Sequence, residues 1–170
     1  PLAVPPPLPP PGLKNLAPLA ALSASSSRVN SDGAFTPDRA IDGIKDNNAS
    51  RWLTEVDAAT PHWLLMEWDQ PYEINVVRVW SGLVGGGSIN NPLTDFEIQY
   101  WDGNIWRTAA SAVGNTKYYN NFVFHPVTTD KVRLWITRAN ANDTTARVFE
   151  MEVWEYDETA GNPAPVDVNS

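Results

Sequence analysis

The segment Arg39–Ser50 is rich in side chains that carry oxygen donors and has a glycine, Gly43, among them. The donors are Asp42, Asp46, Asn47, Asn48 and Ser50. Calcium is a hard cation that takes about six to eight oxygen ligands, mainly carboxylates and carbonyls. A glycine allows the tight turn that brings such ligands together. This pattern predicts a calcium loop. The same residues are also typical of a metal-free surface loop built from Asx turns, so both interpretations are open at this point.

Groups suited to catalysis are sparse. His62 and His125 each border a predicted strand, and neither stands in a zinc-binding pattern such as HExxH. The chain has no cysteine, which excludes a thiolate nucleophile, a thiolate metal site and a disulfide framework. The run 85–87 is three glycines, but the Lys-Ser/Thr pair of a phosphate-binding loop does not follow it.

Two carboxylate pairs have a spacing of two residues: Asp95 with Glu97, and Glu150 with Glu152. Paired carboxylates are the catalytic groups of glycoside hydrolysis. On a strand, however, this spacing only places both members of a pair on the same face. We expect each pair to lie on the outward, solvated face of its strand. The sequence therefore predicts a protein without enzymatic activity of its own.

The composition is that of one folded, acidic domain. Of the 170 residues, 42% are hydrophobic, which is enough for one core. Twelve Lys and Arg against 20 Asp and Glu give a net charge of -8. Such a charge opposes binding to nucleic acid and to an anionic membrane surface. We expect no nucleic-acid partner, and a membrane partner is disfavoured.

Composition shifts divide the chain into three parts. Residues 1–14 are interpreted as a proline-rich linker, in which Pro1–Pro11 favours polyproline II. Residues 157–170 are polar, carry Pro163 and Pro165 and show no hydrophobic periodicity, which is typical of a second linker. The alternative is that both segments are frayed ends. Residues 15–156 remain as one module.

The module shows a period of two, with β-branched and aromatic residues between frequent turn signals, which predicts an all-β sandwich. In 131–137, for example, Val132, Leu134 and Ile136 alternate with polar residues and should face the core. Asp102-Gly103 marks a hairpin turn. A helical turn is expected at Thr36–Ile41. Eight strands are expected: Leu19–Ser25, Trp63–Trp68, Ile74–Trp80, Phe96–Trp101, Trp106–Ala109, Asn121–Phe124, Lys131–Thr137 and Val148–Tyr156.

Several short motifs occur in an order and spacing that resemble one known family. They are Asn15-Leu16-Ala17, Arg39-Ala40-Ile41-Asp42-Gly43, Ser50-Arg51-Trp52, Ile74–Val79, Asp95–Tyr100, Lys131–Leu134 and Phe149–Val153. Together they resemble the discoidin, or coagulation factor V/VIII type C, domain over residues 15–156, and most closely the bacterial family 32 carbohydrate-binding modules. The resemblance implies an eight-stranded antiparallel jelly-roll β-sandwich of the galactose-binding type and a non-catalytic binding role. Animal members usually carry a disulfide, which this chain cannot form.

The resemblance also implies a structural calcium ion that ties the first long loop to the last strand. The carried-over ligands are the side chains of Asp42 and Glu150, Ser50, and the carbonyls of Arg39, Ile44 and Phe149. Asn47-Asn48-Ala49 is an apparent insertion before Ser50, so Asp46 is an alternative to Ser50 as the ligand.

Four predicted loops should meet at the end of the sandwich opposite the chain ends: 26–35, 81–92, 110–120 and 138–147. They are rich in Ser, Asn, Gly and Arg, a composition suited to hydrogen bonds with sugar hydroxyls. Family members bind sugars at this end. The candidate carbohydrate-binding residues are Arg28, Asn30, Asn90, Asn91, Tyr118, Arg138 and Asn142. Arg28, Arg138 and Arg147 together would favour a uronate or another acidic sugar.

The tryptophans divide by their place on the predicted strands. Trp52, Trp63, Trp68 and Trp106 are expected in the core or at its edge. Trp135 and Trp154 should point outward with Glu150 and Glu152, whereas Phe149, Met151 and Val153 point inward. An exposed Trp135–Trp154 pair has three interpretations: a platform for polysaccharide, a docking face for another module, or a cover for the chain's own proline-rich segment, which we favour.

The leading hypothesis is therefore a monomeric carbohydrate-binding module with a structural calcium ion. We expect it to be bacterial, to be secreted or displayed on a cell surface, and to be joined to a glycoside hydrolase, a polysaccharide lyase or other modules. Tethering would hold the catalytic partner near its oligo- or polysaccharide. The alternative hypothesis is an adhesion or protein-interaction module of a cell-surface protein. Fold alone does not decide between the two.

Overall fold

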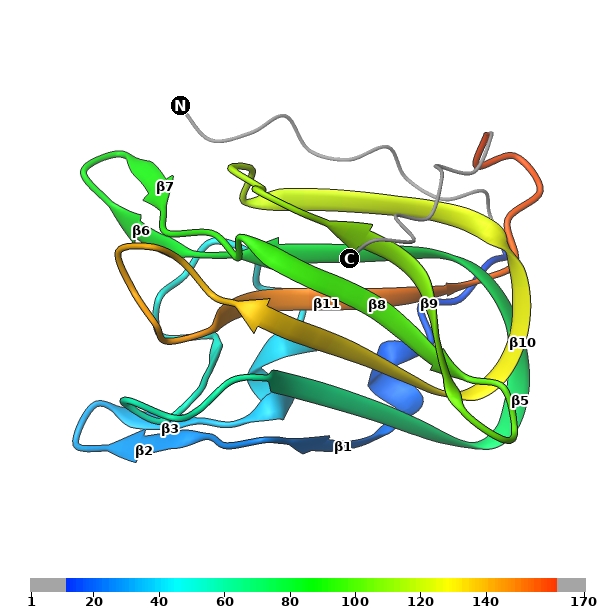
Figure 1. Cartoon of the computed structure of the whole chain (residues 1–170), viewed down its shortest axis with the longest axis horizontal. Coiled ribbons are helices and arrows are strands. Elements are labelled where there is room, and N and C mark those ends of the chain that lie inside the picture. The colour runs from blue at the N-terminus through cyan, green and yellow to red at the C-terminus, as the bar shows by residue number, and fades with distance from the viewer. Residues whose placement is uncertain (1–11, 162–170) are drawn as a thin grey trace.

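Alternating apolar residues fold into a two-layered antiparallel β-sandwich in the computed structural model, which describes residues 12–161 (Figure 1). Two 3-10 helices precede the longer strands: η1 (Ala17–Leu19) and η2 (Pro37–Ala40). The strands are β1 (Ala21–Ala24), β2 (Arg28–Asn30), β3 (Gly33–Phe35), β4 (Trp52–Leu53), β5 (His62–Ser81), β6 (Leu83–Gly85), β7 (Ser88–Asn90), β8 (Asp95–Trp101), β9 (Trp106–Ala112), β10 (Tyr119–Arg138) and β11 (Arg147–Glu155).

The long strands β5 and β10 belong to both layers. In the first layer, residues 62–67 of β5 pair with β1 and with residues 131–136 of β10, which pair in turn with β8, and β8 with β9. In the second layer, residues 74–81 of β5 lie between β11 and residues 119–127 of β10, and β11 also pairs with β4. The β5–β10 register shifts at Val123/Val127 and Thr129/Lys131, between the two halves. Irregularities of this kind let a strand bend from one layer to the other.

Both layers contribute side chains to one core between them. The first layer supplies Leu64, Met66, Val132, Leu134 and Ile136, all fully buried. Val77, Val79, Met151 and Val153 come from the second layer. The predicted inward positions of 132, 134, 136, 151 and 153 are therefore confirmed.

The predicted fold class is confirmed, and each of the eight predicted strand segments is present. Three predictions about their limits were wrong. The segments 63–68 and 74–80 are one continuous strand, β5, and the segments 121–124 and 131–137 are both parts of β10, because these strands cross between layers without a break. Leu19 belongs to η1 and not to the first strand, since Pro18 favours the start of a helical turn.

The turn predictions also hold. The helical turn predicted at 36–41 is η2, with Thr36 and Ile41 as its caps. The hairpin predicted at Asp102-Gly103 joins β8 to β9, and Gly103 adopts a φ of 97°, which glycine reaches without strain. The loops 26–35 and 81–92 contain two short hairpins that were not predicted, β2–β3 and β6–β7.

The segments that begin and end the sandwich lie side by side. Asn15 forms an antiparallel bridge with Trp154, the Leu16 amide donates to the Val153 carbonyl at 2.6 Å, and the Glu155 amide donates to the Lys14 carbonyl at 3.1 Å. The predicted linkers 1–14 and 157–170 lie mostly outside the described residues. Within 12–161, no helix has the length and apolar character needed to cross a bilayer.

Candidate functional site

The loops that follow the strands meet at one end of the sandwich, opposite the paired chain segments (Figure 1). We call this end the loop pole; it comprises residues 26–35, 48–54, 81–92, 110–120 and 138–147. The indole of Trp52 donates to the Ser26 carbonyl at 2.9 Å, and the Asn140 amide donates to the Pro92 carbonyl at 2.9 Å. The Ser81 amide donates to the Tyr118 carbonyl at 2.8 Å. Hydrogen bonds therefore connect loops that are far apart in the sequence.

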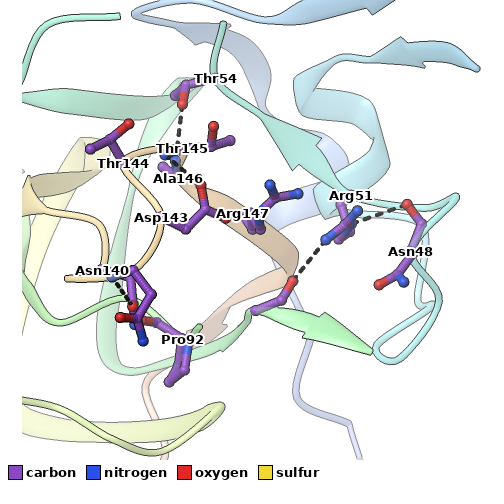
Figure 2. A network of polar contacts seen from close by, with 12 residues as sticks. Asn48, Arg51, Thr54, Pro92, Asn140, Asp143, Thr144, Thr145, Ala146 and Arg147 are labelled. Atoms are coloured by element: carbon purple, nitrogen blue, oxygen red, sulfur yellow. Dashed lines mark hydrogen bonds and ion pairs between the residues drawn. The ribbon is translucent and has the colours of Figure 1, made fainter. Parts of the chain in front are cut away.

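Arg51 joins two of these loops from a buried position. Its Nε donates to the Asn48 carbonyl and its Nη1 to the Gly82 carbonyl, both at 3.0 Å (Figure 2). The guanidinium lies 5.7 Å from the centre of the Phe149 ring. Asn48 in turn exchanges two hydrogen bonds of 2.8 Å with the backbone of Val84 in β6. The β6–β7 hairpin is thereby fixed against residues 48–51.

Arg28 and Arg147 lie close to Arg51. The Arg28 Nη2 donates to the hydroxyl of Thr145 at 2.6 Å, whereas its Nε is buried without a hydrogen-bond partner. Arg147 forms an ion pair through its Nε with Asp143, four residues earlier (Figure 2). Burial, followed by repulsion from Arg147, lowers the pKa of Arg28. The pKa of Arg51 falls to about 10 through burial first and then through repulsion from Arg147 and Arg28.

Position 82, whose carbonyl accepts from Arg51, requires a glycine. Its φ is +127°, and a Cβ there would stand 2.6 Å from the Asn90 carbonyl oxygen. We expect Gly82→Ala to lower the free energy of unfolding by at least about 1 kcal/mol, from backbone strain plus this clash. Gly87→Ala is the matched control, because Gly87 also has a positive φ, +77°, but open space around it. Urea unfolding of both variants measures the difference, and equal losses would contradict the role of the clash.

His62 connects the start of β5 to the last loop. It is buried, and because a carbonyl can only accept, its Nε2 carries the proton donated to Thr144 at 3.2 Å. The Nδ1 is buried without a hydrogen-bond partner. Protonating it would place an unpaired charge inside the protein, and burial accordingly lowers the pKa of His62.

This environment predicts a loss of stability in acid. Below the unfolded pKa of about 6.5, the unfolded chain takes up a proton that the folded protein resists, so stability falls as the pH falls from there towards the lower folded pKa. The melting temperature of His62→Gln should decline less than that of the wild type between pH 7.5 and 5. The exposed His125 provides the control, because His125→Gln should decline as the wild type does. Parallel declines for all three proteins would refute the assignment.

The predicted calcium segment is folded against β11. The hydroxyl of Ser50 donates to Asp42 Oδ2, and the Ile44 amide donates to Asp42 Oδ1 at 3.0 Å. The Gly43 amide donates to Glu150 Oε2 at 2.9 Å. The side chains of Asp42 and Ser50 are therefore brought close to Glu150, which is distant in sequence. Asp42 and Asp46 are both exposed, but it is Asp42 that bonds with Ser50.

The prediction that Glu150 and Glu152 lie on a solvated face was wrong. Their exposed fractions are only 2% and 6%. Gly43 lies against Glu150, and Lys45, Arg78 and Trp154 contact Glu152. Lys45 forms an ion pair with Glu152 at 3.2 Å and lies 4.4 Å from the Trp80 ring centre. Burial, the nearby carboxylate of Asp42 and that of Glu152 raise the pKa of Glu150 to about 8.

The Oε1 of Glu150 is buried without a hydrogen-bond partner. A buried carboxylate beside a second carboxylate, with one oxygen unpaired, has the chemistry of a cation ligand. The residues present thus fit calcium by their donor type. A group of three or more His, Cys, Asp or Glu residues arranged for a metal does not occur in 12–161, so the remaining donors would have to be hydroxyl and carbonyl oxygens.

The other predicted site residues are spread over the loop pole. Asn30 and Asn142 are exposed, Asn90 is exposed and donates to the Gly85 carbonyl at 3.1 Å, and Asn91 is half-buried with a φ of 52°. Arg138 ends β10 opposite Asp95, so the arginines that cluster with Arg28 are Arg51 and Arg147.

Sequence analysis did not select Arg51, Asp143 or Thr145. Arg51 stands inside the recognised Ser50-Arg51-Trp52 motif, but nothing in the motif shows that it reaches across to Gly82. Asp143 and Arg147 are four residues apart, but that spacing indicates an ion pair only on a helix, and these residues lie in a loop and at the start of β11.

The tryptophan predictions hold in part. Trp52 and Trp68 are buried as predicted. The prediction that Trp63 and Trp106 lie in the core or at its edge was wrong. Trp63 is half-buried on the outward face opposite Trp135, and Trp106 lies over the outward-pointing Arg133. Trp135 and Trp154 do not form a pair, because Trp135 lies opposite Trp63 in the first layer and Trp154 opposite Val76 in the second.

The outward face of Trp135 is also partly covered. The guanidinium carbon of Arg133 lies 4.0 Å from the ring centres of both Trp106 and Trp135, so the ring faces turned towards Arg133 cannot stack on a sugar. The proline-rich segment that was expected to cover a Trp135–Trp154 surface falls largely outside the described residues.

This chain is similar in sequence to one protein family and in fold to several solved structures. The model of the F5/8 type C domain matches residues 21–151. Among solved structures, the family 32 module of Streptococcus pneumoniae EndoD is similar with a TM-score of 0.68 at 18% identity, covering 84% of this chain and 100% of that one. The family 32 module of Clostridium perfringens NanJ in complex with galactose has a TM-score of 0.67 at 17% identity, covering 84% and 99%.

A third similar structure is chitosan-binding module 2 from the chitosanase/glucanase of Paenibacillus sp. IK-5, in complex with chitotriose. It has a TM-score of 0.66 at 22% identity and covers 82% of this chain and 98% of that one. A search of curated protein sequences gave no significant match. At these identities the structural likeness concerns the fold.

Proposed function

The chain belongs to the F5/8 type C domain family, and from this premise we propose that it is a non-catalytic carbohydrate-binding module with its site at the loop pole. The observation that supports this most strongly is the convergence of five loop segments, tied to one another by hydrogen bonds, around exposed or half-buried Arg and Asn side chains. Rigidly held loops that present such donors and acceptors suit sugar hydroxyls. The similar modules with galactose and chitotriose bound support the same class of ligand.

The candidate contact residues remain those expected from the sequence, with one addition. Arg28, Asn30, Asn90, Asn91, Tyr118, Arg138 and Asn142 would meet the ligand, and Thr145 would hold Arg28 in position through its hydroxyl. Arg51 has a different task, because both of its bonded nitrogens serve backbone carbonyls. It would keep the loops in place for binding.

We further propose that a calcium ion is held between residues 39–50 and β11. The ligands would be the carboxylates of Asp42 and Glu150, Ser50, and the carbonyls of Arg39, Ile44 and Phe149. The contact between Ser50 and Asp42 supports Ser50 in preference to Asp46. The ion would neutralise the two carboxylates and fix the first long loop to the last strand. Its role would be structural.

The module would serve a larger, extracellular polysaccharide-active protein by tethering it to its glycan. The adjacent segments 14–16 and 153–155 support this, because attached partners would start from the end opposite the loop pole. A modest affinity then suffices, since tethering raises the effective concentration of the partner.

Binding of the full 170-residue chain, in calcium-containing buffer, to an array of neutral, basic and acidic glycans tests the proposal. We expect binding to one class of sugar, and loss of that binding when Asn142 and Asn30 are both replaced by alanine. If working controls bind and this protein binds no glycan, the proposal is wrong. The protein-interaction module is then the remaining hypothesis.

A further inference from the structure

The charge at the loop pole is opposite in sign to that of the whole protein. The net charge of the chain is -8, yet Arg28, Arg51 and Arg147, which we call the arginine cluster, lie together there. Arg147 repels Arg28, both repel Arg51, and the carboxylate of Asp143 attracts Arg28 and Arg51. Three positive charges against one negative charge leave two positive charges uncompensated. Since screening is strong beyond about 8 to 10 Å, a ligand at the pole is influenced mainly by these near charges.

The hydrogen bonds of the arginine cluster show which guanidinium N–H groups are already bonded within the protein. Arg51 is 5% exposed and donates to the carbonyls of Asn48 and Gly82. It therefore contributes positive charge to the loop pole but does not contact a ligand. Arg147 uses its Nε edge for Asp143, and a guanidinium has four further N–H groups on its terminal nitrogens. Arg28 donates from Nη2 to Thr145, while its buried Nε has no partner.

An unpaired N–H on a buried guanidinium atom is costly, and a cluster of like charges adds to that cost. A ligand that brings a negative charge would offset the repulsion. Its two adjacent acceptor oxygens would meet terminal N–H groups of Arg28 and Arg147, because the Arg28 Nε itself is enclosed by protein. The planar fork of an arginine matches a carboxylate in this way. A carboxylated sugar combines this group with hydroxyls for the neighbouring asparagines.

We propose that the loop pole selects a hexuronate residue of an acidic polysaccharide, with the sugar carboxylate on Arg28 and Arg147. This inference rests on the proposed carbohydrate-binding function and names its ligand class. Asp143 and Thr145 act as positioning residues that hold the two guanidinium groups. A cationic oligosaccharide such as chitotriose is disfavoured, because its ammonium groups would meet the arginine cluster.

The test compares four probes on the calcium-loaded protein by isothermal titration calorimetry: tetragalacturonate, a sulfated galactan oligosaccharide, a neutral galactan oligosaccharide and chitotriose. We expect the tightest binding for tetragalacturonate, weakening by at least about threefold between 50 and 500 mM NaCl. Arg28→Gln should weaken that binding by at least about tenfold, and Arg28→Lys, which keeps the charge without the fork, by a smaller factor.

Arg107→Gln is the matched control, because Arg107 is exposed and pairs with Asp102 at the hairpin between β8 and β9. It removes the same charge and should leave affinity within about twofold. Melting temperatures verify that each variant is folded; if Arg28→Gln is not, Arg28→Lys and the salt series decide. Binding of the neutral probe or chitotriose in preference to tetragalacturonate overturns this inference and leaves the proposed function intact. Equal binding of the sulfated probe overturns the choice of a carboxylate, and absence of binding to any glycan overturns both.

Discussion

Replacing Glu150 with glutamine should raise the melting temperature when calcium is removed and lower it when calcium is present. In the chelated wild type, Glu150 is a buried carboxylate with an unpaired oxygen beside Asp42. The neutral amide avoids that cost, so Glu150→Gln should melt above the wild type in chelator at pH 8. With calcium at about a hundred times its Kd, binding adds about 2.7 kcal/mol to the wild type, or about 5 to 10 °C. The variant should gain little and melt below the wild type.

Asp46→Asn supplies the control for this prediction. Asp46 is exposed, whereas Ser50 contacts Asp42, so the Asp46 variant should keep the full response to calcium. Differential scanning fluorimetry of the three proteins, with calcium and with chelator, gives the comparison. An identical wild-type melting temperature in the two buffers would eliminate the calcium site, and loss of the response in Asp46→Asn would move the ligand from Ser50 to Asp46.

Truncating Trp52 should cause the largest loss of stability. The side chain is fully buried in β4, which pairs with β11, and its indole donates to the Ser26 carbonyl. Trp52→Ala removes the packing and leaves that carbonyl without its donor. We expect a loss of about 3 to 5 kcal/mol, a large part of the total of about 5 to 15 kcal/mol for a domain.

Two further substitutions make this measurement specific. Trp52→Phe keeps most of the volume and removes the hydrogen bond, so its loss should be much smaller than that of Trp52→Ala. Trp63→Ala truncates the same residue type at a half-buried position and should also cost less. Urea unfolding gives all three values. An equal loss for Trp63→Ala would mean that burial does not determine the effect.

The strands were predictable because their chemistry is local. The spacing of Val132, Leu134 and Ile136 indicates one buried face. Asp102-Gly103 indicates a hairpin, because glycine allows the backbone conformation that the turn requires. The continuity of β5 and β10 was not predictable in this way. Whether a strand bends and continues, or ends and restarts, depends on its partners in both layers.

The candidate site was predictable in its parts but not in its contacts. Asp42 and Glu150 were selected through a family resemblance, yet the burial of Glu150 depends on the Gly43–Lys45 segment lying against β11, which strand alternation cannot reveal. Alternation assigns a residue to a face and says nothing about what covers that face. Arg51 was missed for the same reason, since its partners lie 3 and 31 residues away.

The antiparallel contact between residues 14–16 and 153–155 has a mechanical consequence. Because the two segments run in opposite directions, the chain leaves the module on both sides from the same edge. A pull on the flanking segments would therefore load the outermost contacts first. On the C-terminal side these are the Asn75–Asp157 and Tyr156–Glu73 hydrogen bonds, and the Glu155–Lys14 bond then precedes the Leu16–Val153 bond. Bonds broken in sequence yield at low force. Under tension this edge of the module should unzip first, while the loop pole, at the far end, carries no load until the edge has opened.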